Sequence, residues 1–256
     1  MTSLHRLLVP TEDIVSGSPR LPREALRHLR ALRPKEGERF ELFDGTGRTR
    51  VFRHAGGALS PDGEVREAPP RGPATVTLFA CVTKGSRWDW TVEKATELGA
   101  DRIVPVISAR TIVRLPAGDR AAKRDRWRRV AEDAARQSDA VWLPEISEAV
   151  DFADALPLVR ASRCFVGALT EPPPPPILAA VSAARASGSA SAGDWSVFVG
   201  PEGDFSPDEL DALLAVASPV SLGPAVLRAE TAALFALSVL VANVHAAQEA
   251  PQKGAP

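Results

Sequence analysis

Apolar and polar positions follow two different patterns along the chain, and the change falls near residue 73. Beyond it, apolar runs of strand length alternate with longer segments of helical period. The run "ATVTLFACV" is typical of a strand covered on both faces, and "RIVPVI", "RCFVGAL" and "WSVFVG" follow at intervals that leave room for helices. This alternation predicts an α/β domain with a parallel sheet over residues 73–250.

Residues 1–72 have a β-rich pattern. The segment "RLLVP" predicts a strand and "PREALRHLRALRP" a helix, while "ERFELFDGTGRTRVFRH" has two alternating strands around a turn that contains Asp-Gly. The cluster "APPRGP" predicts a linker to the second domain. This part contains more Arg and Lys than Asp and Glu although the whole chain has a formal charge of −1, so positive charge is concentrated at the N-terminal end.

The composition excludes several classes of protein. A net charge of −1 disfavours a general nucleic-acid coat, so any RNA must meet a local basic patch. Cys81 and Cys164 lie in separate apolar runs and the four histidines are scattered, which disfavours a disulfide framework or a metal site. The N-terminus has no signal-peptide pattern, and only the last helix approaches the length of a membrane span. We expect a cytoplasmic protein that spans no membrane.

The loop "GPEGD" links a predicted buried strand to a helix. Ser206 and Glu209 have the spacing of a capping box, with Pro207 at the first helical position. Ligands bind at such places because the carboxyl ends of parallel strands leave backbone N–H groups free. The alternative is a tight connection in which glycine only permits the turn. The glycine spacing matches neither a P-loop nor a dinucleotide-binding turn.

A second loop, "SLGPAVLRAET", repeats the order of strand, Gly-Pro and helix. The helix that follows, "TAALFALSVLVANV", is apolar nearly all round, so we expect it to be buried on most sides. Two Gly-Pro loops at neighbouring strand ends, backed by a buried helix, predict a nucleoside-sized pocket. Arg228 and Glu230 form a charged pair at the start of this helix.

Several segments in the same order carry a resemblance to one family. They are "RHLRALRPKEGERFELFDG", "KGSRWDWTVEKATELGADRIVPVISART", "WRRVAEDAARQS", "LPEI", "VGPEGDFSPDEL" and "LGPAVLRAETAAL". Together they resemble the RsmE family of 16S rRNA (uracil-N3)-methyltransferases, which belong to the SPOUT class. The resemblance implies a PUA-like RNA-binding domain over residues 1–72 and a SPOUT domain with a deep trefoil knot over residues 73–250. It also implies S-adenosylmethionine as cofactor, a homodimer, ribosomal RNA as partner and no metal.

The resemblance also assigns roles to individual residues. It implies that cofactor contacts come from three loops: Leu169 and Thr170; Gly200, Pro201, Glu202 and Gly203; and Leu222, Gly223, Pro224, Val226 and Leu227. Main-chain groups in such loops can bind an adenine edge without a particular side chain. Arg228 and Glu230 would stand nearest the methyl group and the RNA.

Methylation of uracil N3 requires that the atom lose a proton or that the resulting anion be stabilised. We expect Arg228 to stabilise negative charge on the base or hold a phosphate, and Glu230 to act as the base or to orient Arg228. The alternative is that both residues only cap the last helix.

Arginine and lysine residues supply candidate RNA contacts: Arg6, Arg23, Arg27, Arg30, Lys84 and Arg87. The N-terminal arginines could equally form a solvated helix face. Trp88 and Trp90, beside Arg87, could stack on a base, but at least one fits a core or interface position.

Some positions depart from the family pattern. Asp204 stands where the family usually has a second glycine, and Ala225 where an arginine is common; Arg136, Asp139 and Ala140 also differ. These departures leave two alternatives open. One is a catalytically silent SPOUT paralogue that binds RNA and cofactor, and the other is a methyltransferase that acts on another RNA position.

Overall fold

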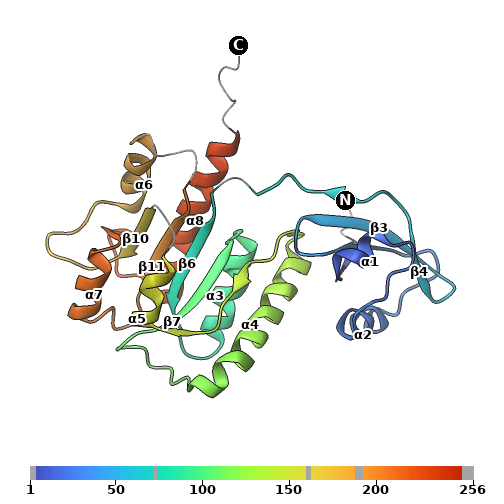
Figure 1. The fold of residues 1–256 in the computed structure, drawn as a ribbon, viewed down its shortest axis with the longest axis horizontal. Helices are drawn as coiled ribbons and strands as arrows, with labels where there is room; N and C mark the ends of the chain where they lie inside the picture. The colour runs from blue at the N-terminus through green and yellow to red at the C-terminus, as the bar shows by residue number, and fades with distance from the viewer. Residues whose placement is uncertain (1–3, 72–73, 160–162, 188–192, 250–256) are drawn as a thin grey trace, which may run out of the picture. The chain divides into compact units, whose positions relative to one another are not determined.

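The computed structural model describes residues 4–71, 74–159, 163–187 and 193–249. The chain divides into two compact units, Met1–Pro70 with Glu132–Leu143, and Arg71–Ala131 with Pro144–Pro256. Figure 1 shows the course of the chain through both. Residues 132–143 belong to the first unit, although the linear boundary at residue 72 assigns them to the second domain.

The first unit is built on a five-stranded sheet. Its strands are β1 (His5–Leu8), β2 (Arg39–Phe43), β3 (Arg48–Ala55), β4 (Ala58–Pro61) and β5 (Arg66–Glu67), and its helices are α1 (Thr11–Val15) and α2 (Arg23–Leu32). Strand β1 runs parallel to β2, whereas β2, β4 and β5 pair antiparallel with β3. The predicted strand, helix and hairpin are therefore confirmed, and their apolar faces meet in a core that contains Leu7, Leu29, Phe40 and Phe52.

The chain segment that follows helix α4 (Ala117–Gln137) packs against the hairpin formed by β2 and β3. Gly47 has a φ of 98°, and a Cβ atom at this position would collide with the indole of Trp142. Gly47 N also donates a hydrogen bond of 3.0 Å to the Val141 carbonyl oxygen. Glycine at this turn thus permits both the left-handed backbone and the close approach of residues 141–143.

The second unit contains a parallel sheet in the order β12-β10-β11-β6-β7-β8, with β9 also paired to β7. The strands are β6 (Val76–Cys81), β7 (Arg102–Ile107), β8 (Glu145–Ile146), β9 (Val150–Asp151), β10 (Arg163–Gly167), β11 (Trp195–Val199) and β12 (Ser218–Val220). All their pairings are parallel, which confirms the predicted sheet type. The last strand is only three residues long, because the chain after Val220 leaves the sheet.

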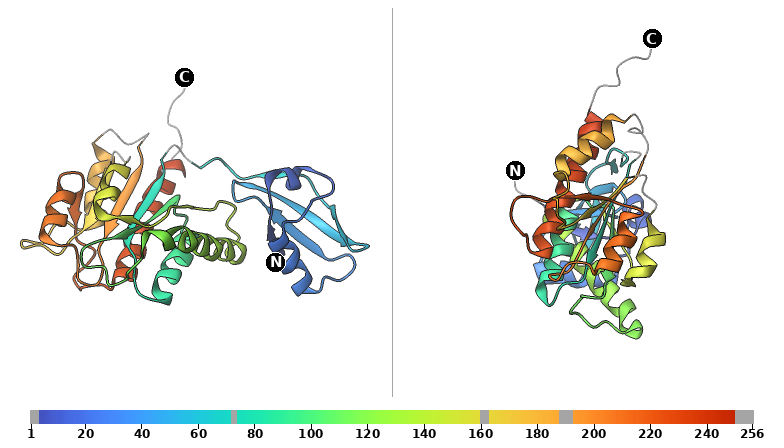
Figure 2. Two further views of the ribbon diagram at one scale, coloured as in Figure 1. Left: turned by 60° about the horizontal axis from the view of Figure 1, so that its bottom comes forward. Right: turned by 90° about the vertical axis from the view of Figure 1, so that its left-hand side faces the viewer.

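Helices cover both faces of this sheet (Figures 1 and 2). They are α3 (Ser86–Glu97), α4, α5 (Phe152–Ala155), the 3₁₀ helix η1 (Leu156–Leu158), α6 (Ile177–Ala186), α7 (Pro207–Leu214) and α8 (Ala229–Glu249). Along β6, Val76 and Leu78 pack with residues of α3, α6 and α8, while Phe79 and Cys81 pack with residues of α5 and α7. Alternate side chains enter opposite cores, as a strand buried on both faces requires.

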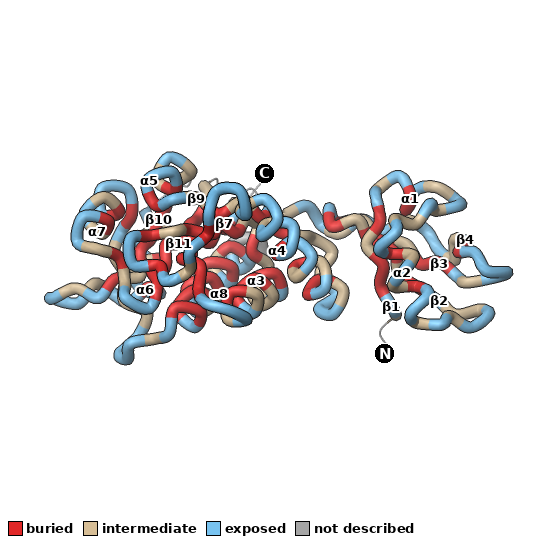
Figure 3. Tube along the Cα trace, turned by 90° about the horizontal axis from the view of Figure 1, so that it is seen from below, coloured by how far each residue is buried: buried red, intermediate tan, exposed pale blue. Residues whose placement is uncertain are grey.

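Helix α8 closes the larger of these cores. It packs against α3, β6 and β11, and Ala233, Ala236, Leu237 and Leu240 are almost completely buried. Its window Ala229–Ala246 is long and apolar enough to cross a membrane by composition, but half of the window is buried inside the protein. In Figure 3 the buried colour follows the central strands and much of α8. The helix is therefore a core element whose apolar character is explained by packing.

Candidate cofactor pocket and substrate groove

A cavity of about 300 Å³ lies where strands β10, β11 and β12 end. These strands are neighbours in the parallel sheet, so their carboxyl ends lie at the same edge. The residues that line the cavity are Gly167, Ala168, Leu169, Val199, Gly200, Pro201, Glu202, Asp204, Ser221, Leu222, Gly223, Ala225, Val226, Leu227, Arg228, Ala229 and Ala232. The volume falls within the range of ligand pockets, roughly 300–1,000 Å³.

Hydrogen bonds hold the segment after β12 against the connection between β10 and α6. Ser221 N donates to the Pro175 carbonyl at 2.9 Å, and Ile177 N donates to the Ser221 carbonyl at 2.9 Å. A Cβ atom on Gly167 would lie 2.9 Å from Leu222 Cδ1, so glycine at the end of β10 lets Leu222 approach. The cavity wall is therefore assembled from segments more than fifty positions apart in the chain.

Most of the predicted cofactor residues line this cavity: Leu169, Gly200, Pro201, Glu202, Leu222, Gly223, Val226 and Leu227. Thr170, Gly203 and Pro224 belong to the same loops but do not line it. No role was predicted for Gly167, Ser221 or Asp204, which also line the cavity. The strand-ending glycine in "RCFVGAL" was an available signal for Gly167, whereas nothing in the sequence marked Ser221.

An open groove adjoins the cavity and shares Arg228 with it. Ser86, Arg87, Asp89, Trp90 and Glu93 of α3 line the groove, together with Arg228 and with Glu230 and Thr231 of α8. The groove therefore lies between the start of α3 and the start of α8, two helices that pack together.

Glu230 and Arg228 do not form a pair with each other. Glu230 is only 7% exposed, and its Oε2 atom is buried without a hydrogen-bond partner. Arg228 is exposed, and within the described part of the chain its side chain makes no ion pair within 4.0 Å. An acidic group near a helix N-terminus is stabilised by the helix dipole, but within the described residues no backbone N–H donates a hydrogen bond to the Glu230 carboxylate.

Arg87 and the two tryptophans have different environments. Arg87 Nη1 lies 2.9 Å from Glu202 Oε1, and this ion pair connects the start of α3 to the "GPEG" loop. Trp88 is 2% exposed and packs edge-on against Trp127, so it is a core residue. Trp90 is 43% exposed and lines the groove, so of the two it is the one that can contact a ligand.

The two cysteines line neither the cavity nor the groove. Burial raises the pKa of Cys81 to about 12 and that of Cys164 to about 11, so both thiols are protonated at neutral pH. They act as small apolar residues in the core between the sheet and helices α5 and α7.

Comparison with known proteins identifies the family. The chain matches the RNA methyltransferase domain family over residues 70–241. Ribosomal RNA small subunit methyltransferase E of Mycobacterium bovis is 34% identical over 216 residues, which cover 83% of this chain and 80% of that protein. The protein of the same name from a Synechocystis strain is 31% identical over 244 residues, 91% of this chain and 76% of the relative. The chain belongs to the ribosomal RNA small subunit methyltransferase E family.

Solved structures agree with this assignment. Ribosomal RNA small subunit methyltransferase E from Neisseria gonorrhoeae, bound to S-adenosylmethionine, has a TM-score of 0.76 and 27% identity, and covers 93% of this chain and 97% of its own. A methyltransferase from Legionella pneumophila, also in complex with S-adenosylmethionine, has a TM-score of 0.74 and 26% identity, and covers 94% of this chain and 98% of its own.

The predicted RNA contacts of this methyltransferase E family member lie in different settings. Arg23, Arg27 and Arg30 are exposed on α2 and line one shallow surface, where Arg27 pairs with Glu24 at 3.1 Å. Lys84 is exposed before α3. These positions are accessible to a phosphate.

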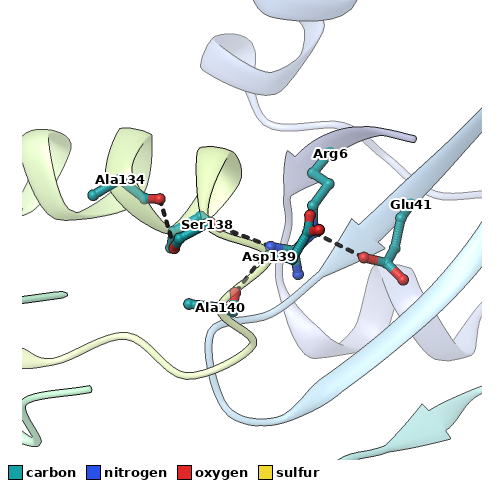
Figure 4. A network of polar contacts seen from close by, with 7 residues as sticks. Arg6, Glu41, Ala134, Ser138, Asp139 and Ala140 are labelled. Atoms are coloured by element: carbon teal, nitrogen blue, oxygen red, sulfur yellow. Dashed lines mark hydrogen bonds and ion pairs between the residues drawn. The ribbon is translucent and has the colours of Figure 1, made fainter. Parts of the chain in front are cut away.

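Arg6 is not accessible, and the prediction that it contacts RNA is wrong. The residue is 3% exposed, and its guanidinium lies 4.2 Å from the centre of the Phe43 ring. Its Nε atom donates to Glu41 at 2.8 Å, while Nη1 donates to the carbonyl oxygens of Ala135 and Ala140 at 2.7 and 3.0 Å (Figure 4). Arg6 therefore ties β1 to the end of α4 and the chain after it, which is a structural role.

Proposed function

We propose that this protein transfers a methyl group from S-adenosylmethionine to N3 of a specific uridine in small-subunit ribosomal RNA. The observation that carries the proposal is the pairing of a nucleoside-sized cavity with a groove that shares Arg228 and contains the buried, unpartnered Glu230. The relatives named ribosomal RNA small subunit methyltransferase E support the substrate and the reaction.

The cavity fits the cofactor. Its walls are mostly apolar, as the adenine and ribose carbons require, and glycines at positions 167, 200 and 223 leave backbone groups accessible. Residues of the loops after β10, β11 and β12 would hold S-adenosylmethionine, which supplies a methyl group on a sulfonium when bound. The loops keep the donor in position and exclude water, and orientation of this kind lowers the barrier to transfer.

The groove would hold the uridine. Glu230 lies in it with a free carboxylate oxygen, so it can accept the N3 proton from the base or through one water. Arg228 lines both the cavity and the groove, where its positive charge can stabilise the negative charge that develops on the uracil oxygens. Trp90 offers an exposed indole face to the base.

The finer features of the fold are part of the same proposal. A deep trefoil knot in the SPOUT domain is supported by the contact between residues 220–222 and the connection from β10 to α6, where Ala168, Pro175 and Ile177 hydrogen-bond to the later segment. A PUA-like RNA-binding role for the first unit is supported by its small sheet and by the exposed arginines of α2.

A homodimer in the cytoplasm completes the proposal. Trp90 of α3 and Phe235 of α8 are 43% and 44% exposed, and the two helices pack together. Apolar side chains exposed on adjoining helices favour burial against a second copy. Ribosomal RNA as substrate accounts for a cytoplasmic location.

The test compares ribosomal RNA from a wild-type and a deletion strain by nuclease digestion and mass spectrometry. We expect one N3-methyluridine to disappear on deletion and to return when the wild-type gene is restored. Unchanged modification, together with a cofactor that still raises the melting temperature of the purified protein, would favour the silent paralogue. Loss of a different modified nucleotide would favour a methyltransferase with another target.

A further inference from the structure

Asp204 occupies an unusual place in the cofactor cavity. It follows the "GPEG" turn, where its backbone N donates to the Pro201 carbonyl at 2.9 Å, and it lines the cavity beside Gly200. Its Oδ1 atom accepts a hydrogen bond of 2.8 Å from the N–H of Phe205. A Cβ atom on Gly200 would lie 3.0 Å from this Oδ1 atom, so the absence of a side chain at Gly200 makes room for the carboxylate.

The backbone at Asp204 is in the left-handed region, with a φ of 60°. Glycine adopts this conformation without strain, whereas a residue with a side chain adopts it at a cost in free energy. Backbone geometry alone favours glycine at this position, and aspartate is among the few residues with a side chain that adopt the region often, so it places a carboxylate here at a small cost.

The charges around the cavity leave this carboxylate unpaired. The neighbouring carboxylate of Glu202 is paired with Arg87. Arg110, from another segment, uses Nη1 for the carbonyl oxygens of Gly203 and Phe205, at 2.8 and 3.2 Å. Within the described residues no cation lies within 4.0 Å of Asp204, and its Oδ2 atom has no hydrogen bond.

We propose that Asp204 is a cofactor-binding residue whose Oδ2 atom accepts a hydrogen bond from bound S-adenosylmethionine. An ionised carboxylate only accepts hydrogen bonds, so its partner must be a donor. S-adenosylmethionine offers three kinds of donor, the ribose hydroxyls, the adenine amino group and the ammonium group of its methionine part. The inference rests on the proposed function, since it concerns the same cavity, and it adds a side-chain contact to loops that otherwise bind through the main chain.

The experiment measures binding by isothermal titration calorimetry and apo-protein melting for wild type, Asp204→Asn and Asp204→Gly. Asparagine can keep the bond to Phe205 N–H and tolerates the left-handed backbone, so it replaces the charged Oδ2 acceptor with a neutral NH2 donor and keeps the turn. We expect Asp204→Asn to bind S-adenosylmethionine about tenfold more weakly, because a charge-assisted hydrogen bond is lost. Asp204→Gly loses at least as much affinity without a lower apo melting temperature. The exposed Asp208→Asn, four residues along, is the matched control and keeps wild-type affinity.

A second ligand identifies the donor. 5′-Methylthioadenosine keeps the adenine and ribose but lacks the ammonium group, so an equal loss for both ligands assigns the contact to the nucleoside part and a loss for S-adenosylmethionine alone assigns it to the ammonium. Wild-type affinity in both variants overturns the inference and leaves the proposed function standing. A lower apo melting temperature in both, parallel to the loss of affinity, also overturns it in favour of a structural role. A wild-type protein that binds no S-adenosylmethionine overturns both proposals.

Discussion

Glu230 is the residue on which the proposed chemistry depends most directly. Its side chain is buried in the groove, yet one carboxylate oxygen lacks a partner, and a buried unpaired polar atom costs free energy unless it is used. A nearby substrate that presents an N–H group would satisfy this atom.

Replacement of Glu230 by glutamine should therefore impair the chemical step. We expect kcat to fall by about 100-fold or more, because a positioned acid or base contributes this much, while the affinity for S-adenosylmethionine stays the same. Single-turnover methylation of ribosomal RNA measures the first quantity and calorimetry the second. Glu93→Gln, in the same groove, is the control for a change of charge there. A Glu230→Gln enzyme with kcat within threefold of wild type would exclude Glu230 as the base.

The buried hydrogen bonds of Arg6 lead to a prediction about the free energy of unfolding. Arg6→Ala leaves Glu41 and the carbonyl groups of Ala135 and Ala140 without their donor, and breaking a buried ion pair typically costs about 3 kcal/mol. The free energy of unfolding in urea should fall by this amount, whereas Arg23→Ala, an exposed control, should change it by less than about 0.5 kcal/mol. If Arg6→Ala weakened RNA binding but left stability unchanged, Arg6 would be a phosphate contact after all.

At the scale of elements, helix α7 begins where its capping-box sequence predicts. Ser206 accepts a hydrogen bond from Glu209 N, and Glu209 accepts one from Ser206 N, so the capping box is complete and confirmed. Glu209 also accepts a hydrogen bond of 2.7 Å from Ala109 N, which follows β7. Glu209 therefore fixes both the start of α7 and the loop that follows β7.

The capping box gives a third prediction. Ser206→Ala should lower the free energy of unfolding by about 1 kcal/mol, because one N-terminal N–H of α7 loses its partner. Ser206→Asp keeps an acceptor at the N-cap and should be close to wild type. Thermal melts of the three proteins measure the difference, and equal values for alanine and aspartate would show that the cap adds no stability.

The elements that the sequence predicted best are those with a strong local signal. The strands of the parallel sheet follow from apolar runs, and α3 ends before Gly99, whose φ of 88° suits glycine. Strand β12 ends at Val220, because Ser221 hydrogen-bonds with the chain at Pro175 and Ile177. That exchange of partners depends on a segment far away in the chain, so no local pattern could reveal it.

At the scale of the whole molecule, the proposed division of work between the units can be tested. The exposed arginines of α2 lie in the first unit, while the cofactor cavity lies in the second. Each phosphate contact adds to the dependence of binding on salt. Removal of the α2 arginines should therefore weaken RNA binding and leave cofactor binding unchanged.

We expect the triple change Arg23→Ala, Arg27→Ala and Arg30→Ala to lower the affinity for ribosomal RNA about tenfold and to reduce the slope of log K against log salt by about 2. Calorimetry with S-adenosylmethionine should give the wild-type value. Lys123→Ala, Arg128→Ala and Arg129→Ala remove the same charge from the exposed side of α4 and serve as control. An equal loss in both triples would mean that net charge, and no particular surface, governs RNA binding.

The sequence by itself determined the class of the fold, the two Gly-Pro loops and the candidates Arg228 and Glu230, because each depends on residues that are neighbours in the chain. Only the tertiary structure decided which of these candidates share a cavity, that Trp88 is buried while Trp90 is exposed, and that Arg6 is enclosed. The inclusion of residues 132–143 in the first unit was decided in the same way. The physical reason is that burial and pairing result from contacts between distant segments, such as Arg6 with Ala135 or Leu222 with Gly167, which a one-dimensional pattern does not record.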